Sequence, residues 1–414
     1  MEGASMRVEI RKFERQPAAV KAPHSKSAAH RMLICAGLAS GVSTVRGVDI
    51  SEDILATIDC LRALGAEVTV INAGGEETEN ITLAQDAVIR VRGTDPAFAD
   101  SAVLRCRESG STLRFMAPVA ALSGREMILT GSSKLMSRPL TVYDDLFREK
   151  GMTTERTGEA MRVGGRLASG TYKVPGNISS QFISGLLFAL PLADGDSRIV
   201  IEGRAESRPY IDMTIETLRD FGVWTGWGQD GRIISIPGGQ SYKAHDAEVE
   251  GDWSGAAFLI ALGAEVTGLD AGSTQGDKIC TEYFRKLDEG QTQLDITDCP
   301  DLGPVIAAYA ACRNGCVMTG TKRLMYKESD RGNSIKAELA KFGVSVDVEE
   351  DSITVGCGAV TPAECLYGHN DHRIVMALSV ICAHTGGVIE GAEAVNKSFP
   401  DFFERLTEMG VSVR

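Results

Sequence analysis

The stretch Ile58-Asp-Cys-Leu-Arg-Ala-Leu-Gly65-Ala-Glu-Val-Thr-Val70 predicts an amphipathic helix that ends at a glycine and is followed at once by a short β-strand. Apolar residues recur at helical spacing before Gly65, so the helix has one face to bury. Glycine suits the position just past the last turn, where many helices become left-handed. The β-branched residues that follow favour a strand.

The same helix–glycine–strand pattern recurs along the whole chain. The glycines that end its copies are Gly65, Gly151, Gly222, Gly290 (in a degenerate copy), Gly343 and Gly410. Their separations average roughly seventy residues, a periodicity typical of a repeated module. We therefore predict an α/β (α+β) fold of βαβ-type modules with extra strands, three modules in each of two similar halves with a cleft between them.

Length and composition are consistent with two soluble domains. A chain of 414 residues exceeds what one hydrophobic core usually supports. A boundary is expected near Tyr242 to Glu250, where a polar stretch follows the turn at Pro237. We see no signal peptide, and the most apolar segment, residues 182–193, is too short to span a bilayer. A cytoplasmic location is therefore expected.

Charge and cysteine content narrow the possible partners. The net charge of −13 argues against nucleic acid and against an anionic membrane. An acidic protein that binds small phosphates must gather its Arg and Lys residues in one place. The ten cysteines include no Cys-x-x-Cys pair, so most are expected to be small buried residues in a reducing compartment, with no metal site.

Several polar motifs stand just before expected helices in the first half. Lys26, Ser27 and Arg31 open an apolar helix whose free N–H groups suit an anion, although an ordinary N-cap with solvated cations is the alternative. Glu108-Ser-Gly110-Ser-Thr-Leu-Arg114 opens another helix in the same way. Arg138 and Arg208 each precede a proline and are expected on extended segments before helices. Ser179-Ser-Gln181 is either a ligand-binding cluster or a cap.

Charged motifs of the second half take the corresponding place in other modules. Lys327-Glu-Ser-Asp-Arg331, Asn370-Asp-His-Arg373 and Lys397-Ser-Phe-Pro-Asp401 each precede a helix, the second one expected over Ile374 to Ile381. In parallel βαβ units these helix starts share one side of the fold, so the basic groups are expected to converge. Asp301, at a Pro-bounded helix start, is either a cap or a carboxylate held against these cations as a general base.

Taken together, these motifs resemble the EPSP synthase family over nearly the entire chain. The resemblance implies two domains, each of three inverse βαβαββ units, here residues 21–247 and residues 1–20 with 248–414. It also implies transfer of the enolpyruvyl group of phosphoenolpyruvate to the 5-hydroxyl of shikimate 3-phosphate, through a tetrahedral intermediate. This reaction belongs to the shikimate pathway, which leads to chorismate and the aromatic amino acids. The resemblance implies no cofactor and a monomer.

The resemblance also assigns residues to the two substrates. Shikimate 3-phosphate would be bound by Lys26, Ser27, Arg31, Ser179, Ser180, Gln181, Ser207, Asp301 and Lys327. Phosphoenolpyruvate would be bound by Lys26, Gly110, Arg138, Gln181, Arg331, Arg373 and Lys397. Asp301 would accept the proton of the attacking hydroxyl, with Glu328 and Lys26 as candidates for proton transfer at the enol carbon. An anion with a carboxylate and a phosphate requires several such Arg and Lys residues.

Three positions depart from the family pattern, and two other functions stay open. Glu108 stands where Asn is common, Phe115 where Pro is usual, and Arg323 where Asn is frequent. The related UDP-N-acetylglucosamine enolpyruvyl transferase is one alternative, but its pattern has Lys-Asn where this chain has Lys26-Ser27, and usually a Cys in the loop before Arg138. A non-catalytic protein that binds phosphorylated ligands on the same fold is the other.

Overall fold

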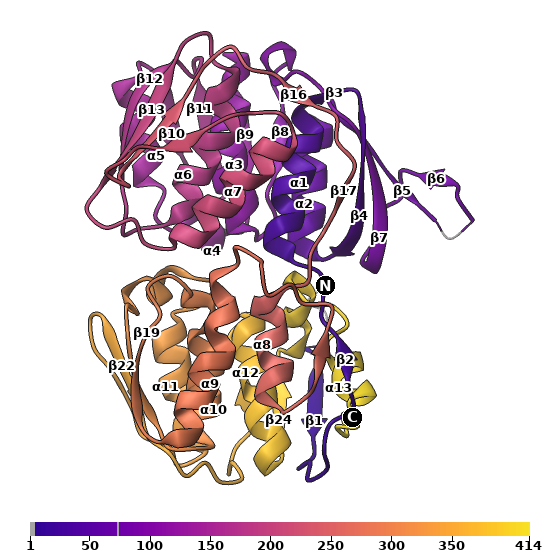
Figure 1. Cartoon of the computed structure of the whole chain (residues 1–414), viewed down its shortest axis with the longest axis vertical. Coiled ribbons are helices and arrows are strands. Elements are labelled where there is room, and N and C mark those ends of the chain that lie inside the picture. Colours follow the sequence, from indigo (N-terminus) through magenta and orange to yellow (C-terminus); the bar gives the residue numbers. More distant parts are fainter. Residues whose placement is uncertain (1–4, 73) are drawn as a thin grey trace. The chain divides into compact units, whose positions relative to one another are not determined.

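The chain divides into two compact units in the computed structural model, which describes residues 5–72 and 74–414 (Figure 1). The N unit is His24–Glu250, and the C unit combines the chain up to Pro23 with Gly251–Arg414. The backbone passes between the units twice, at Pro23–His24 and at Glu250–Gly251. Residues 1–4, which belong to a predicted domain, lie outside the described residues.

Two four-stranded sheets of the N unit have the same topology. One has the order β10 (Thr153–Arg156), β11 (Ala160–Gly164), β9 (Met127–Thr130) and β8 (Val103–Arg105). The other has the order β14 (Gly226–Trp227), β15 (Ile233–Ile236), β13 (Ser197–Glu202) and β12 (Gly170–Pro175). In each sheet the first two strands along the chain are parallel and the other pairings are antiparallel. The helices between the strands are α3 (Gly110–Ala120), α4 (Ser133–Met136), α5 (Thr141–Glu149), α6 (Ser180–Ala189) and α7 (Arg208–Asp220).

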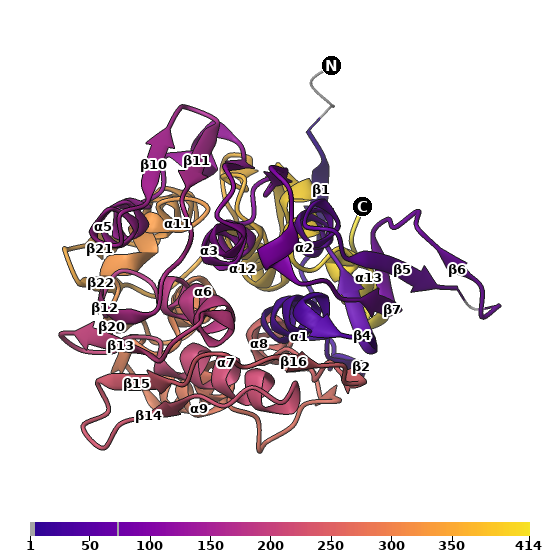
Figure 2. The ribbon, with the colours of Figure 1, turned by 90° about the horizontal axis from the view of Figure 1, so that it is seen from above.

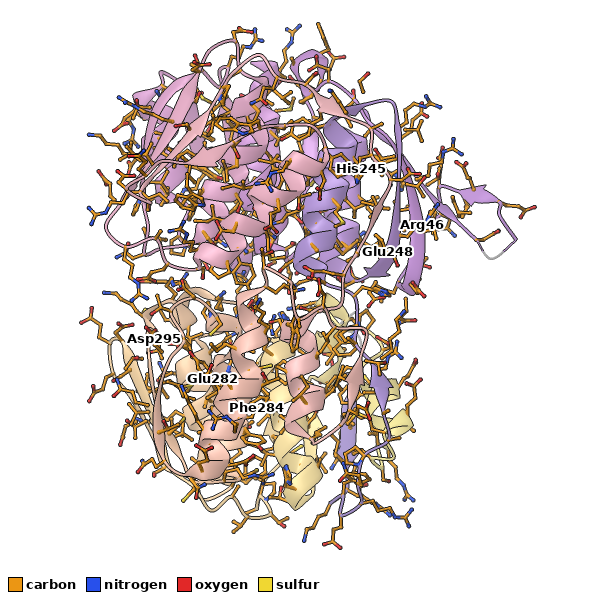
Figure 3. All side chains as sticks on the ribbon, in the orientation of Figure 1. Arg46, His245, Glu248, Glu282, Phe284 and Asp295 are labelled. Carbon is orange, nitrogen blue, oxygen red and sulfur yellow. The ribbon has the colours of Figure 1, made fainter. Side chains whose placement is uncertain are left out.

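The third sheet of the N unit includes one strand from the carboxy-terminal end of this unit. Its order is β17 (Ala247–Glu248), β4 (Val42–Ile50), β7 (Ala84–Arg92), β5 (Glu67–Ile71) and β6 (Glu77–Thr78). The strand β17 pairs in parallel with β4, so that Glu248 lies opposite Arg46 (Figure 3). With β17 as its first strand, this sheet follows the topology of the other two.

The C unit contains a sheet with the same topology, and a second sheet that includes a strand from the start of the chain. One sheet has the order β19 (Thr292–Asp295), β20 (Cys316–Thr319), β22 (Ser352–Val355) and β21 (Val346–Val348). In the other, β24 (Gly387–Glu390) pairs in parallel with β23 (Leu366–Tyr367) and antiparallel with β1 (Arg7–Ile10). The amide of Glu9 donates to the carbonyl of Arg414 at 2.8 Å, which joins the two ends of the chain. Two-stranded pairs complete the units: β2 (Val20–Lys21) with β18 (Val266–Thr267), and β3 (Ala39–Ser40) with β16 (Tyr242–Lys243).

Helices fill the interior of each unit and the sheets lie outside them (Figures 1 and 2). The most buried helices of the N unit are α1 (Lys26–Leu38), α3 and α6, and those of the C unit are α8 (Trp253–Ala261), α10 (Gly303–Ala311) and α12 (His372–Thr385). These helices are apolar on nearly every face, as helices buried on all sides must be. Their first turns therefore carry the polar residues of the sequence motifs.

The predicted helix-ending glycines are confirmed. Gly65, Gly151, Gly222, Gly343 and Gly410 have φ of 101°, 73°, 76°, 78° and 94°, and Gly290 has φ of 155°. The prediction of an immediate strand is wrong for the last copy, where the only pairing among the described residues is a single bridge from Val413 to Ile10. The helix expected over Ile374 to Ile381 is longer, so that His372 and Arg373 form its first turn. Arg208 was expected on an extended segment, but it is the first residue of α7, because Ser207 adopts φ 54° and turns the chain.

Seven cysteines are buried in the cores: Cys35, Cys60, Cys106, Cys280, Cys299, Cys316 and Cys382. Burial raises the pKa of Cys35 well above its ordinary value. Cys312 lies just after α10, and Cys316 is the first residue of β20. Over residues 5–72 and 74–414, every helix falls short of the length and apolar character that a membrane span requires.

Candidate active site

A carboxylate surrounded by three cations lies at the start of α10 in the C unit. Asp301 Oδ1 accepts from Arg331 Nη1 at 2.8 Å and from Lys327 Nζ at 3.1 Å, and Oδ2 accepts from Arg373 Nη2 at 3.4 Å. Asp301 makes no side-chain cap on α10. Its carboxylate instead faces the first turns of α11 (Arg331–Lys341) and α12, as the second of the two alternatives for this residue requires.

Arg331 is bound by three carboxylates in this cluster. Its side chain is 1 % exposed and is bound to Asp371, which is 0 % exposed, to Glu328 at 2.7 Å and to Asp301. Asp371 also accepts from the backbone N–H of Ser329 and of Arg373, so it caps α12 and fixes the loop before α11. The guanidinium therefore has one orientation, set by three carboxylates.

The last predicted cation, Lys397, is held by a turn. Its Nζ donates to the carbonyl oxygen of Asn370 at 2.8 Å and to Asn370 Oδ1 at 2.7 Å. Asn370 directly precedes Asp371 and the first turn of α12. The Lys397 ammonium is thus tied to the same helix start that carries Arg373.

The electrostatics of the cluster hold Asp301 ionised. Burial alone would raise the pKa of Asp301, but the positive charges of Arg373, Lys327 and Arg331 hold it well below its ordinary value. Burial lowers the pKa of Lys327, and the charge of Arg331 adds to this effect, against the opposing attraction of Asp301. Burial would also lower the pKa of Arg331, but Asp371, Glu328 and Asp301 raise it.

In the N unit, the first turn of α1 carries Lys26 and Ser27. Lys26 Nζ lies 2.6 Å from Asp53 Oδ2, and both side chains are mostly buried. Asp53 lies in the first turn of α2 (Glu52–Ala63). This carboxylate fixes the direction of the ammonium. Sequence reasoning missed Asp53, because an acidic residue at a helix start is usually explained by the helix dipole alone.

Arg31 lies one turn further along α1 and is 2 % exposed. Its Nε donates to Thr214 Oγ1 at 2.9 Å, Nη1 to the carbonyl of Ser27 at 2.6 Å and Nη2 to the carbonyl of Tyr210 at 2.8 Å. Burial lowers the pKa of Arg31 to about 10. The guanidinium also lies 5.3 Å from the ring centroid of Phe115, one of the residues that departs from the family pattern. Arg31 therefore joins α1 to α7 and orients Ser27.

A second polar group joins the starts of α3 and α6. Gln181 Oε1 accepts from Arg114 Nη1 at 2.7 Å, and its Nε2 donates to Ser111 Oγ at 2.8 Å. A Cβ added to Gly110 would lie 2.8 Å from Arg138 Nη1 and 3.1 Å from Arg114 Nη1. Gly110 thus leaves room for two guanidinium groups beside the open end of α3.

The three predicted serines lie at the starts of α6 and α7. Ser179 is the N-cap of α6 and accepts from the amide of Gln181 at 3.3 Å, so the capping alternative describes what this residue does here. Ser180 is the first residue of α6 and is buried. Ser207 is the left-handed N-cap of α7, three residues before the Tyr210 carbonyl that binds Arg31.

Within each unit the structure thus brings the predicted residues together at helix starts. In the C unit, Asp301, Lys327, Glu328, Arg331 and Arg373 form one bonded cluster, with Lys397 tied to it through Asn370. Sequence reasoning quoted Asp371 inside a motif but gave it no role. Its signal was its place directly before a helix among basic residues. Among the described residues there is no group of three or more potential metal ligands.

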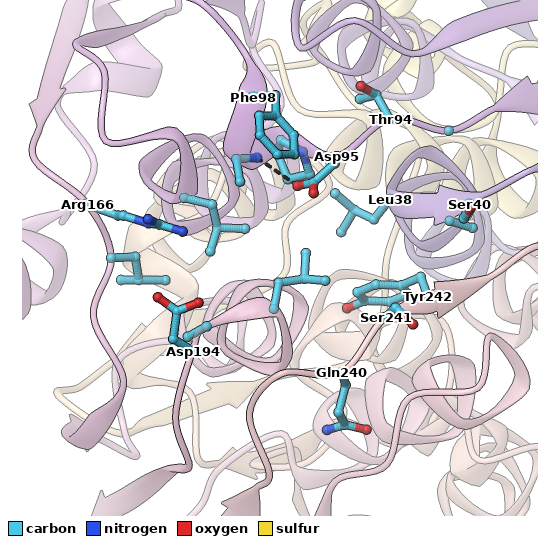
Figure 4. Close-up of a pocket in the computed structure, with 18 of the residues that line it drawn as sticks. Leu38, Ser40, Thr94, Asp95, Phe98, Arg166, Asp194, Gln240, Ser241 and Tyr242 are labelled. Carbon is cyan, nitrogen blue, oxygen red and sulfur yellow. Dashed lines mark hydrogen bonds between the residues drawn. The ribbon is translucent and has the colours of Figure 1, made fainter.

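A separate pocket of 720 Å³ lies in the N unit at the opposite ends of its helices (Figure 4). Leu38 ends α1, and Leu122 and Leu192 lie in the short turns that continue α3 and α6. Arg166 and Asp194 stand at its edge. None of the predicted site residues lines this pocket.

Comparison with solved structures defines the class of protein. An EPSP synthase from Acinetobacter baumannii superposes with a TM-score of 0.76 at 22 % identity, covering 99 % of each chain. The enolpyruvyl transferase NikO from Streptomyces tendae gives a TM-score of 0.74 at 14 % identity, covering 99 % of this chain and 98 % of that one. The fold is that of the enolpyruvyl transferases.

Sequence comparison then narrows the class to one family. The family model for EPSP synthase (3-phosphoshikimate 1-carboxyvinyltransferase) matches residues 10–406. The 3-phosphoshikimate 1-carboxyvinyltransferases of Clostridium kluyveri and Clostridium novyi are 39 % and 36 % identical to this chain, covering 94 % of each sequence. The chain belongs to the EPSP synthase family.

Proposed function

We propose that the chain transfers the enolpyruvyl group of phosphoenolpyruvate to the 5-hydroxyl of shikimate 3-phosphate, giving 5-enolpyruvylshikimate 3-phosphate and phosphate. Membership of the family supports the reaction. The observation that carries the assignment of residues is Asp301, a carboxylate enclosed by Lys327, Arg331 and Arg373. This cluster would supply cations for two anionic substrates and a base for a hydroxyl group.

The proposed roles follow the charges of the two substrates. Arg331, Arg373 and Lys397 of the C unit, with Lys26, Gly110, Arg138 and Gln181 of the N unit, would bind the phosphate and carboxylate of phosphoenolpyruvate. Lys327 and Asp301, with Lys26, Ser27, Arg31, Ser179, Ser180, Gln181 and Ser207, would bind shikimate 3-phosphate. We propose that the units are the two family domains, each of three βαβαββ repeats, and that residues of both are needed to bind the substrates.

The reaction needs one acid and one base, and each acts in both directions. The oxygen of the 5-hydroxyl attacks C2 of the enol while its proton passes to Asp301. C3 gains a proton from Glu328 or Lys26, and a tetrahedral intermediate results. C3 then returns a proton, the bond from C2 to the phosphate oxygen breaks, and phosphate leaves with the bonding electron pair.

For Asp301 to act as the base, the substrates would have to change its surroundings. A carboxylate neutralised by three cations is a poor base. Phosphate and carboxylate groups of the substrates compete for Lys327, Arg331 and Arg373, and their negative charge raises the proton affinity of Asp301. Asp301 would then become a stronger base only when the substrates are bound.

Phosphate release from phosphoenolpyruvate tests the proposal, with shikimate 3-phosphate or UDP-N-acetylglucosamine as acceptor. Release with shikimate 3-phosphate alone is expected, and Asp301→Ala should lower kcat by about 10²–10⁴. Release with the nucleotide sugar instead would contradict the assigned acceptor. Binding of both substrates without release would leave a ligand-binding protein. A cytoplasmic location remains a proposal that rests on the sequence, and a monomeric state remains one that rests on the family resemblance.

A further inference from the structure

One face of α11 carries two buried charges with different surroundings. Arg331 opens the helix and Glu338 follows seven residues later, which places both on the same face two turns apart. Glu338 is 2 % exposed and accepts from the amide of Tyr367 and from His369 Nε2, both at 2.9 Å, and from Lys341 Nζ at 3.0 Å. Burial would raise the pKa of Glu338, but these hydrogen bonds lower it, so the group is ionised. A carboxylate only accepts, so His369 must donate its Nε2–H.

The segment that Glu338 holds is a turn with left-handed backbone. His369 and Asn370 are consecutive non-glycine residues with φ of 52° and 51°. This conformation is uncommon for non-glycine residues, although Asn and His adopt it more readily than most. Within the described residues, the contacts of Glu338 with Tyr367 and His369 tie this turn to α11.

The far side of the same turn holds two cations of the candidate site. The carbonyl oxygen and Oδ1 of Asn370 accept from Lys397 Nζ. The next residue, Asp371, accepts from Arg331 Nε at 2.9 Å. A path of direct contacts thus runs from Glu338 through His369, Asn370 and Asp371 back to Arg331 on the helix where it began.

We infer that Glu338 and His369 are positioning residues, which set the Lys397 ammonium and the Arg331 guanidinium for the donor substrate without touching it. This inference rests on the proposed function, since it takes Lys397 and Arg331 as ligands of phosphoenolpyruvate. Release of the turn would free the backbone at Asn370 to change its position. Both oxygens that hold Lys397 would then move, because both belong to that one residue.

Two substitutions of His369 distinguish the effect of its hydrogen bond to Glu338 from the effect of its backbone conformation. Asn tolerates left-handed backbone but is too short to reach Glu338. Gln places an amide N–H at nearly the distance of the histidine Nε2 from the backbone. His369→Asn should raise the KM for phosphoenolpyruvate at least about fivefold, since small displacements of binding groups have large effects. His369→Gln should stay within about twofold of wild type.

A third variant, Lys341→Met, is the matched control. Lys341 contacts the same carboxylate and also donates to the carbonyl of Cys365 at 3.0 Å, but it makes no contact with the turn at 369–370 among the described residues. Its loss should lower the melting temperature and leave the KM for phosphoenolpyruvate unchanged. Glu338→Gln, which keeps an acceptor for the Tyr367 amide, replaces His369→Asn if that variant does not fold.

The measurements are phosphate release with each substrate varied in turn, and thermal unfolding of each variant. A rise in KM for phosphoenolpyruvate alone in His369→Asn, with recovery in His369→Gln, supports the inference. An unchanged KM, an equal rise for shikimate 3-phosphate, or the same rise in Lys341→Met overturns it. Wild-type protein that releases no phosphate would instead overturn the proposed function, which is a different result.

Discussion

Asp371 and Arg331 form a two-pronged ion pair in the interior of the C unit. Oδ2 of Asp371 lies 2.9 Å from Nε of Arg331, and Oδ1 lies 3.3 Å from Nη2. The two side chains are 0 % and 1 % exposed. A pair with so little access to water cannot lose one partner without leaving the other charge buried.

Asp371→Asn is therefore expected to destabilise the protein. Arg331 keeps Glu328 and Asp301 as partners, so the loss should be about 1–3 kcal/mol, below the cost of an uncompensated buried charge, and urea unfolding can measure it. The matched control is Glu350→Gln, which breaks the exposed pair with Lys322 in the same unit and should leave the midpoint unchanged. Equal midpoints for wild type and Asp371→Asn would contradict a stabilising role for this ion pair.

Gly110→Ala should weaken donor binding with little effect on stability. The added Cβ would lie 2.8 Å from Arg138 Nη1, the mobile end of a long side chain, so the guanidinium rather than the backbone gives way. We expect the KM for phosphoenolpyruvate to rise about tenfold, as for one lost charge-assisted hydrogen bond. The KM for shikimate 3-phosphate should not change. A large fall in melting temperature would instead mean that α3 itself is disturbed.

Asp53→Asn tests whether Lys26 depends on its partner. Lys26 Nζ lies 2.6 Å from Asp53 Oδ2, and the amide keeps the shape while removing the charge. We expect kcat/KM to fall about tenfold, because a freed ammonium samples other rotamers. The Asp59→Asn variant, which alters an exposed partner of Arg107, is the control and should keep wild-type kinetics. Unchanged kinetics in Asp53→Asn would leave the carboxylate with a structural role only.

His30 predicts a pH dependence of stability in the N unit. Its side chain is 1 % exposed, and burial, with the charges of Lys26 and Arg31, holds its pKa well below the ordinary value. The unfolded chain binds a proton near pH 6.5 that the folded chain cannot bind, so stability falls as the pH drops below that value. The loss by pH 5 is at most about 2 kcal/mol.

Urea unfolding at pH 7 and pH 5 measures this loss, with His30→Gln as the comparison. The amide has no proton to gain, so the variant should lose less stability between the two pH values. The lowered pKa of His384 adds a similar dependence in the C unit, which both proteins share. Equal losses in wild type and His30→Gln would contradict the assignment to His30.

The local features of this fold could be predicted from sequence, and the long-range ones could not. Gly65 and its counterparts mark helix ends because a left-handed residue is required there whatever the surroundings. No residue pattern in the sequence identifies β4 as the partner of β17, because each strand can pair with any neighbour of suitable length. Knowledge of the family supplied the crossing of the chain between units, which the residues alone did not indicate.

The residues of the candidate site could also be predicted only in part. The cations around Asp301 were predicted because they stand at equivalent places in successive modules. Asp53 and Asp371 were missed because an acidic residue at a helix start has an ordinary explanation, through the helix dipole for Asp53 and as a cap for Asp371. The prediction that Arg208 lies on an extended segment was wrong. A proline is tolerated in the first turn of a helix, so the helix can begin before Pro209.

The pairing of β1 with β24 has a consequence for synthesis of the protein on the ribosome. Residues 7–10 are made first, but their partner strand consists of residues 387–390. The N unit, residues 24–250, contains all the strands of its own sheets and can fold while the rest is being translated. The strand β1 cannot pair with β24 until almost the whole chain has been synthesised. Folding of the C unit is therefore expected to finish after that of the N unit.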